Sequence, residues 1–231
     1  MTEIAVYIEG GGNTAGQKAE LRRGFDALFA NQKVLAGNKR TSLTFICCGG
    51  RQEAYEAFKN AQKVNGERIN ALLVDSETSI APAPKDANGK LDNARDSLIR
   101  IAQLRKKEAR DARGQGDGWD LPNEIAPQIH LMVQCMEAWL VADPDKLEEF
   151  FKQRFKQRFK KSTLPKRANL EQEPKADIYE KLKNATKDTQ KGEYGKIKHA
   201  SKLLEMIRPE EVSSKCPRFE IFQDWLVESI S

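Results

Sequence analysis

Acidic residues follow two apolar runs in the first third of the chain. Glu9 comes directly after residues 3–8 (EIAVYI), whereas Asp75 and Glu77 follow residues 69–74 (INALLV). A hard divalent cation such as Mg²⁺ takes oxygen ligands and keeps several of its waters, so two or three carboxylates are enough to hold it. We therefore predict that Glu9, Asp75 and Glu77 are catalytic residues that bind Mg²⁺ or Mn²⁺.

The residues after Glu9 favour contact with a phosphate group. Gly10, Gly11 and Gly12 carry no side chain and allow the backbone to come close to a ligand. Asn13 leads into a predicted helix, whose N-terminus attracts anions. We predict that these four residues bind the ligand. Acidic strand ends also arise from capping and solubility, so the joint placement of both motifs carries the prediction.

The elements that must position these residues alternate in type. Residues 3–8, 43–48 and 69–74 are short apolar runs, and in the segments between them the apolar residues recur at the spacing of a helix. Such alternation predicts a mostly parallel sheet with helices on both faces, with function at the carboxyl ends of the strands. The helical faces are Leu21, Phe25, Leu28 and Phe29 in the first helix, and Ala54, Phe58, Ala61 and Val64 in the second.

The rest of the chain predicts one more strand followed by helices. We expect a Toprim-like (Rossmann-like) α/β core over 1–142 and a helical C-terminal lobe over 143–231 that packs on it. Within these parts the patterns predict a helix at 91–112, a strand at 129–134, a linker at 162–175, and helices at 177–187, 196–206 and 217–229.

Four residues outside the acidic motifs carry weaker signals. Glu137 follows the predicted fourth strand, either as a further carboxylate of the site or as a helix N-terminal residue favoured by the macrodipole. Lys196 and His199 lie one turn apart on a predicted helix, where Lys196 would stabilise phosphate charge unless both are surface residues. His130, inside an apolar run, is interpreted as an interior histidine.

A direct repeat, KQRF, occupies 152–155 and 156–159. On a helix over 151–161, Phe151, Phe155 and Phe159 would share one face, surrounded by basic side chains. This pattern predicts an amphipathic helix that packs its Phe face and solvates its charges; contact with nucleic acid is the alternative.

Composition and motif content limit the kinds of partner, metal site and cellular location that we expect. The formal net charge of +5 favours a polyanionic partner without requiring one. The four cysteines form no CxxC pair, which favours reduced thiols over a zinc site. We expect a cytoplasmic protein with no signal peptide and no membrane span. The motif of a P-loop ATPase is absent from the sequence, so we expect no ATP hydrolysis by this chain.

The two acidic motifs resemble those of the Toprim domain of primases, topoisomerases and overcoming-lysogenization-defect nucleases. IEGGGN supplies the Glu after the first strand at Glu9, and VDSE supplies the acidic pair at Asp75 and Glu77. The second acid of the pair is Glu here, where Asp is usual, which keeps the charge and lengthens the reach.

A wider set of motifs is similar to a bacterial domain-of-unknown-function family associated with Toprim-like folds and RloB-like proteins. These motifs are IEGGGN, LLVDSE, DGWDLP, HLMVQCMEAWLVAD, KIKHASKLL and CPRFEIFQDWL. The resemblance implies a nuclease-like metal site in a chain encoded beside AAA- or ABC-type ATPases in defence islands, and hence an ATPase partner.

Three functions therefore stay open. The first is a Mg²⁺-dependent nuclease that acts on DNA or RNA with an ATPase partner in antiphage defence. The second is a non-catalytic scaffold that binds and regulates such an ATPase. The third, a phosphatase or phosphotransferase, would need a closed pocket for a small substrate. The sequence also leaves the oligomeric state open, a homo-oligomer included.

Overall fold

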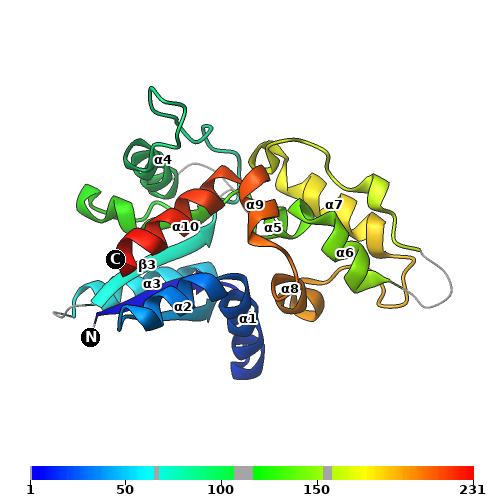
Figure 1. The fold of residues 1–231 in the computed structure, drawn as a ribbon, viewed down its shortest axis with the longest axis horizontal. Helices are drawn as coiled ribbons and strands as arrows, with labels where there is room; N and C mark the ends of the chain where they lie inside the picture. The colour runs from blue at the N-terminus through cyan, green and yellow to red at the C-terminus, as the bar shows by residue number, and fades with distance from the viewer. Residues whose placement is uncertain (1, 65–67, 107–116, 153–157) are drawn as a thin grey trace.

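A four-stranded parallel sheet forms the centre of the molecule (Figure 1). The computed structural model describes residues 2–64, 68–106, 117–152 and 158–231. The strands β1 (Glu3–Glu9), β2 (Ser42–Gly49), β3 (Arg68–Asp75) and β4 (Ile129–Met132) are arranged in the order β2-β1-β3-β4, and every neighbouring pair is parallel. This confirms the predicted α/β class and is consistent with a Rossmann- or Toprim-like fold.

Helices connect the strands and make up most of the second half of the chain. Those in the first half are α1 (Ala15–Leu28), α2 (Ala30–Asn38), α3 (Arg51–Gln62) and α4 (Asn93–Arg105). The others are α5 (Glu137–Ala142), α6 (Pro144–Phe151), α7 (Lys175–Thr186), α8 (Lys196–Leu204), α9 (Pro209–Lys215) and α10 (Pro217–Ile230). Short 3-10 turns lie at Asn123–Gln128, Lys161–Thr163 and Leu170–Gln172. In Figure 1, α6 and α7 form one end of the long axis, and both chain termini lie toward the other.

The alternation of side chains along the strands creates two separate apolar layers. In β1, Ile4, Val6 and Ile8 belong to the larger layer, which is shared with α1, α2, α5 and α10. Ala5 and Tyr7 belong to the second layer, which α3 and α4 cover. β1 and β3 are buried on both faces and therefore read as continuous apolar runs in the sequence, whereas β2, at the edge of the sheet, alternates between buried and partly buried residues.

Helix α8 lies beside α1 near the carboxyl ends of the strands (Figure 1). A Cβ atom added to Gly24 of α1 would lie 2.8 Å from the carbonyl oxygen of Ser201 in α8. Only a glycine therefore allows this approach of the two helices. The close packing fixes the N-terminus of α8, and with it Lys196, against the ends of β1 and β3.

The amphipathic helix predicted over 151–161 is wrong in the described part of that range. Helix α6 ends at Phe151, and Lys152 adopts an extended conformation. The rings of Phe159 and Phe151 stack with centroids 6.0 Å apart, whereas residues eight positions apart on one α-helix are separated by about 12 Å along its axis. Phe155 lies outside the described residues. Lys160 and Lys161 pair with Asp188 and Asp145, so these charges are already partly balanced.

Several predicted boundaries also differ from the structure. Helix α3 ends at Gln62 and leaves Val64 73% exposed, so Val64 is not on the packed face. The fourth strand ends at Met132. The segment 162–175, predicted to be a linker, packs into the larger layer through Leu164 and Leu170. Its apolar residues are spaced too irregularly to show a period, so the sequence does not predict this packing.

The remaining predictions concern larger parts of the chain. The end of the helix predicted at 91–112 lies outside the described residues beyond Lys106. The boundary at residue 142 stays a prediction, although the larger apolar layer contains residues from both sides of it. Within the described ranges, no helix combines the length and the apolar character needed to cross a bilayer. The four cysteines are free, and burial raises the pKa of the Cys47 thiol to about 12.

Candidate metal centre

Three carboxylates predicted from the sequence meet at the carboxyl ends of β1 and β3. Glu9, Asp75 and Glu77 each present an oxygen, and these oxygens lie within 4.8 Å of one another. Among the described residues, this is the group of carboxylates, imidazoles or thiols whose spacing suits a metal ion. Asp75 is 1% exposed, whereas Glu9 and Glu77 are partly buried. Oxygen donors of this kind suit Mg²⁺ or Mn²⁺.

A tight turn brings Glu77 to the cluster. If β3 continued, Asp75 and Glu77 would share one face of the strand, but β3 ends at Asp75. Glu77 instead adopts a left-handed conformation with φ of 66°. Its N–H donates to the carbonyl oxygen of Gln134 at 3.0 Å, which holds the turn in place. A non-glycine residue in this region is uncommon, and such geometry clusters at functional sites.

Asp75 has one carboxylate oxygen that is held by the fold and one that is not. Its Oδ1 accepts a hydrogen bond from the Met136 N–H at 2.9 Å. Its Oδ2 is buried and has no hydrogen-bond partner among the described residues. The amino groups of Lys175 and Lys196 lie 3.7 Å and 3.6 Å from this oxygen, beyond hydrogen-bonding distance. A buried acceptor without a hydrogen bond is costly, and a metal ion bound there would satisfy it.

Arg51 holds Glu9 in position. The Nη1 group of Arg51 donates to Glu9 Oε2 at 2.8 Å, and the same oxygen accepts from the Asp75 N–H at 3.2 Å. The other edge of Arg51 donates two 2.8 Å hydrogen bonds to Asp117, a bidentate pair that fixes the guanidinium plane. Burial raises the pKa of Glu9, and the negative charge of Asp75 raises it further.

Two lysines from the second half of the chain complete the site. Lys175 is the first residue of α7 and donates to both oxygens of Glu77, at 2.9 Å and 2.8 Å. Lys196 is the first residue of α8. A cation at a helix N-terminus is disfavoured by the macrodipole, so the carboxylates must supply the compensation. Burial alone would lower the pKa of each lysine, but the carboxylates outweigh it and raise both pKa values, with Asp75 contributing most.

Glu137 lies behind these lysines, fully buried at the start of α5. It accepts a hydrogen bond from the Tyr194 hydroxyl at 2.9 Å, and its Oε2 lies 3.9 Å from the amino group of Lys196. It is not one of the three carboxylates that converge. Glu137 therefore contacts Tyr194 and Lys196, and its role as a further ligand stays a prediction.

The other residues singled out in the sequence fall in different places. Gly10, Gly11 and Gly12 all have positive φ and line a pocket next to Glu9, whereas Asn13 is exposed and does not line it. His130 is 1% exposed, as expected for an interior residue, and its ring packs against Phe222 and Trp225. His199 is also buried and accepts a hydrogen bond from the Gly195 N–H at the start of α8. Trp139 is buried in the larger apolar layer.

Sequence reasoning missed several residues of the site: Arg51, Asp117, Lys175 and Tyr194. Arg51 follows the second apolar run and its two glycines, so the rule that function collects at strand ends could have found it. Lys175 lies at the end of the predicted linker, where no local pattern marks it. Only the path of the chain brings it to Glu77.

The formal charges of the cluster leave room for a divalent cation. Its carboxylates are Glu9, Asp75, Glu77, Asp117 and Glu137, and its cations are Arg51, Lys175 and Lys196. Among these described residues, the formal negative charges outnumber the positive ones by two. One Mg²⁺ or Mn²⁺ ion would add positive charge at the point where the carboxylates converge. The donor set and the Asp75 oxygen that accepts no hydrogen bond therefore fit a divalent ion.

Comparison with known proteins identifies the family. Searches of curated proteins and of solved structures found no match. A family model described as a domain of unknown function, DUF4276, matches residues 8–227 and so includes every residue of the cluster. The chain therefore belongs to the DUF4276 family.

Proposed function

We propose that this protein is a Mg²⁺- or Mn²⁺-dependent phosphodiesterase that cuts nucleic acid. The observation that carries the proposal is the convergence of Glu9, Asp75 and Glu77, with a buried oxygen of Asp75 that accepts no hydrogen bond from the described residues. The resemblance to Toprim nucleases supports the choice of a phosphodiester substrate. The cations beside the carboxylates support it as well, because a phosphate ester needs both a metal ion and positive charge around it.

The carboxylates would hold the ion, which would polarise the phosphate and lower the pKa of a bound water. The side chains of this chain would do the rest. Arg51 keeps Glu9 turned toward Asp75 and cannot lose its proton at neutral pH. Lys175 and Lys196 place two ammonium groups within 4 Å of Asp75, where they would offset the charge that builds on the phosphate oxygens.

The position of the lysines also explains why these acids tolerate close approach without an ion. Lys175 bridges Glu77 and Asp75, and Lys196 bridges Asp75 and Glu137. Each ammonium separates two carboxylates that would otherwise repel one another. In the loaded site the same lysines would be released to bind substrate phosphate.

The ATPase partner and the role in antiphage defence belong to the same proposal and rest on the resemblance alone. A non-catalytic scaffold for that ATPase is the competing function. It requires no bound ion, so metal-dependent cutting separates the two.

The test is cleavage of plasmid DNA, single-stranded DNA and total tRNA with Mg²⁺ or Mn²⁺. Glu9→Ala and Asp75→Ala should lose cutting, while Glu228→Ala, an exposed glutamate on α10, serves as the matched control. Circular dichroism checks that each variant is folded. Cutting that survives in a folded Asp75→Ala variant would refute the site. A wild type that cuts none of the substrates, alone or with an ATPase from the same locus, would favour the scaffold.

A further inference from the structure

The positive charge of the chain is concentrated in one segment of its second half. Residues 152–202 contain 16 lysines and arginines against 6 aspartates and glutamates, a formal charge of +10. The whole chain has a charge of +5, so the remaining residues together carry −5. Such an asymmetry within one chain is typical of proteins that bind polyanions. The segment contains α7, most of α8 and the connection between them, residues 187–195.

The acids of this connection are already paired. Asp188 pairs with Lys160, and Glu193 pairs with Lys183 at 3.0 Å. Four exposed cations on or beside the connection form no ion pair with an acid of the described chain. We call these four the basic surface: Arg158, Lys187, Lys191 and Lys198.

Arg158 and Lys187 lie at one point of the connection, next to Asp188. The pKa of Asp188 is lowered by its hydrogen bond with Lys160. The charges of Lys187 and Arg158 lower it further, so both cations are close to this carboxylate. Arg158, Lys160 and Asp188 also line one pocket. A single carboxylate thus lies among three cations, which leaves an excess of positive charge at this point.

Lys191 and Lys198 lie at a second point, three residues beyond Asp188. Burial lowers the pKa of His199, and the nearby charges of Lys198 and Lys191 lower it further. The ammonium group of Lys198 donates to the Lys191 carbonyl oxygen at 2.8 Å. That of Lys191 lies 4.8 Å from the centre of the Phe150 ring. Both side chains are therefore held in place, so a bound anion has less side-chain entropy to remove.

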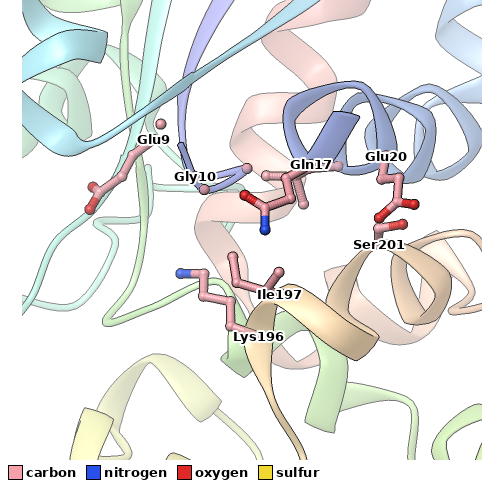
Figure 2. Close-up of a pocket in the computed structure, with 11 residues that line it drawn as sticks. Glu9, Gly10, Gln17, Glu20, Lys196, Ile197 and Ser201 are labelled. Atoms are coloured by element: carbon pink, nitrogen blue, oxygen red, sulfur yellow. The ribbon is translucent and has the colours of Figure 1, made fainter. Parts of the chain in front are cut away.

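Helix α8 joins the basic surface to the acidic cluster. It contacts both α1 and α6, and in Figure 1 it lies between the sheet and the end of the molecule formed by α6 and α7. Lys196 and Lys198 are two residues apart in its first turn, so they point in different directions. Figure 2 shows the amino group of Lys196 directed toward Glu9, with Ile197 beside it.

The start of α8 offers a path between the two sites. Its first turn contains no acidic residue, and the helix dipole favours anions at this end. Ile197 is 52% exposed there and lines the pocket next to Glu9. A chain of phosphates that leaves the basic surface at Lys198 therefore reaches Lys196 and the carboxylates by passing round the start of α8.

From these features we infer that the basic surface binds the phosphate backbone of a nucleic acid and directs it to the metal centre. The choice of nucleic acid among polyanions rests on the proposed function, and the inference adds the surface that holds this substrate. Phosphates are common to all sequences and carry no base identity. Binding should therefore depend strongly on salt and little on base sequence.

The experiment measures binding without cutting. Fluorescence anisotropy of a labelled oligo(dT), in EDTA so that no divalent ion is present, gives Kd at several salt concentrations. One variant combines Arg158→Gln, Lys187→Gln, Lys191→Gln and Lys198→Gln. Each phosphate contact on a single strand contributes about 0.7 to the slope of log affinity against log salt, so the slope should become shallower by about 2.8.

A matched control removes the same charge elsewhere. It combines four substitutions at exposed positions outside residues 152–202: Lys39→Gln, Lys63→Gln, Lys85→Gln and Arg95→Gln. Its slope should stay close to that of the wild type, because phosphate contacts and not net charge set the slope. An unchanged slope in the first variant, an equal change in the control, or a wild type that does not bind would overturn the inference.

Two further measurements separate this inference from its neighbours. Binding of the wild type to anionic lipid vesicles, lost in the first variant and without binding of oligo(dT), would overturn the inference and assign the surface to a membrane. Cleavage assays on the same preparations test the proposed function independently. DNA binding that depends on the basic surface, without cutting, keeps the surface and refutes the phosphodiesterase. Metal-dependent cutting by a first variant whose affinity and rate equal those of the wild type refutes the surface alone.

Discussion

Lys175 offers the sharpest test of how charge is balanced in the site. Its ammonium group bonds both oxygens of Glu77 and lies 3.7 Å from Asp75 Oδ2. Lys175→Met keeps most of the volume of the side chain and removes the charge. The excess of negative over positive charge among the described residues of the cluster then rises by one, and Glu77 and Asp75 lose the cation that bridges them. We predict that the variant is less stable without metal and binds Mg²⁺ more tightly.

The geometry sets the size of both effects. Opposite unit charges 4 Å apart interact by about 4 kcal/mol at an effective dielectric constant of 20. Lys175 is 27% exposed, so solvent reduces this value, and we take about 2 kcal/mol, between the values for exposed and buried pairs. For a chain of this length, that loss lowers Tm by about 4–8 °C. If Lys175 no longer competes with the metal for the carboxylates, the same ~2 kcal/mol strengthens Mg²⁺ binding roughly thirtyfold.

Thermal unfolding with and without Mg²⁺ measures both effects in one assay. An ion at a hundred times its Kd stabilises the folded state by about 2.7 kcal/mol, so Mg²⁺ should restore the stability that Lys175→Met loses. The control is Lys146→Met, which removes a 2.7 Å pair with Glu149 on the surface of α6. Its Tm should change little and should not respond to Mg²⁺ differently from that of the wild type.

Two results would refute this reasoning. One is a Lys175→Met variant that binds Mg²⁺ more weakly than the wild type, because Lys175 would then support the ion and not compete with it. The other is a loss of stability that Mg²⁺ does not reverse, which would make Lys175 a purely structural residue.

Three further predictions concern buried charge away from the cluster. His130 is buried, and burial together with the nearby Arg100 holds its pKa well below the usual value. The folded state therefore loses about 1.4 kcal/mol of stability per pH unit as pH falls below about 6.5, where the unfolded chain binds the proton. Urea titrations of His130→Leu at several pH values should show this dependence of stability on pH abolished. Arg218 pairs with two buried carboxylates at 2.8 Å, so Arg218→Met should cost about 3–5 kcal/mol in chemical denaturation, and a loss below about 1 kcal/mol would contradict this. Burial alone would raise the pKa of Asp143, but hydrogen bonds from Arg208 outweigh it and lower the pKa. Asp143→Asn should therefore cost about 1.5–3 kcal/mol of stability at neutral pH. Unfolding at several pH values should show this cost decrease as pH falls through the lowered pKa.

The sequence was most informative where local pattern and global topology coincide. The three apolar runs are strands, the first and third of them buried on both faces, and parallel strands place their carboxyl ends at one edge. Glu9 and Asp75 could therefore be brought together from the sequence alone. Lys196 was also predicted, although its contact with Asp75 depends on the close packing of α8 on α1.

The second half of the chain was predicted less well because its structure depends on long-range contacts. The KQRF repeat has a helical period, yet helix α6 ends at Phe151, and the ring of Phe159 stacks on that of Phe151. Lys175 stands in a polar, Pro-containing segment with no periodicity, so neither its burial nor its contact with Glu77 could be foreseen. The turn at Glu77 was also missed, since a left-handed residue other than glycine leaves no mark in the sequence.

The central claim is that Glu9, Asp75 and Glu77 hold a divalent ion. The most direct measurement is a crystal structure of the wild type with Mn²⁺, with anomalous scattering collected to locate the ion. The account predicts an anomalous peak coordinated by oxygens of these three residues, including Asp75 Oδ2, and no such peak in Asp75→Asn crystals. Full-occupancy Mn²⁺ elsewhere in the molecule, with Lys175 and Lys196 still closed on an empty carboxylate cluster, would contradict it.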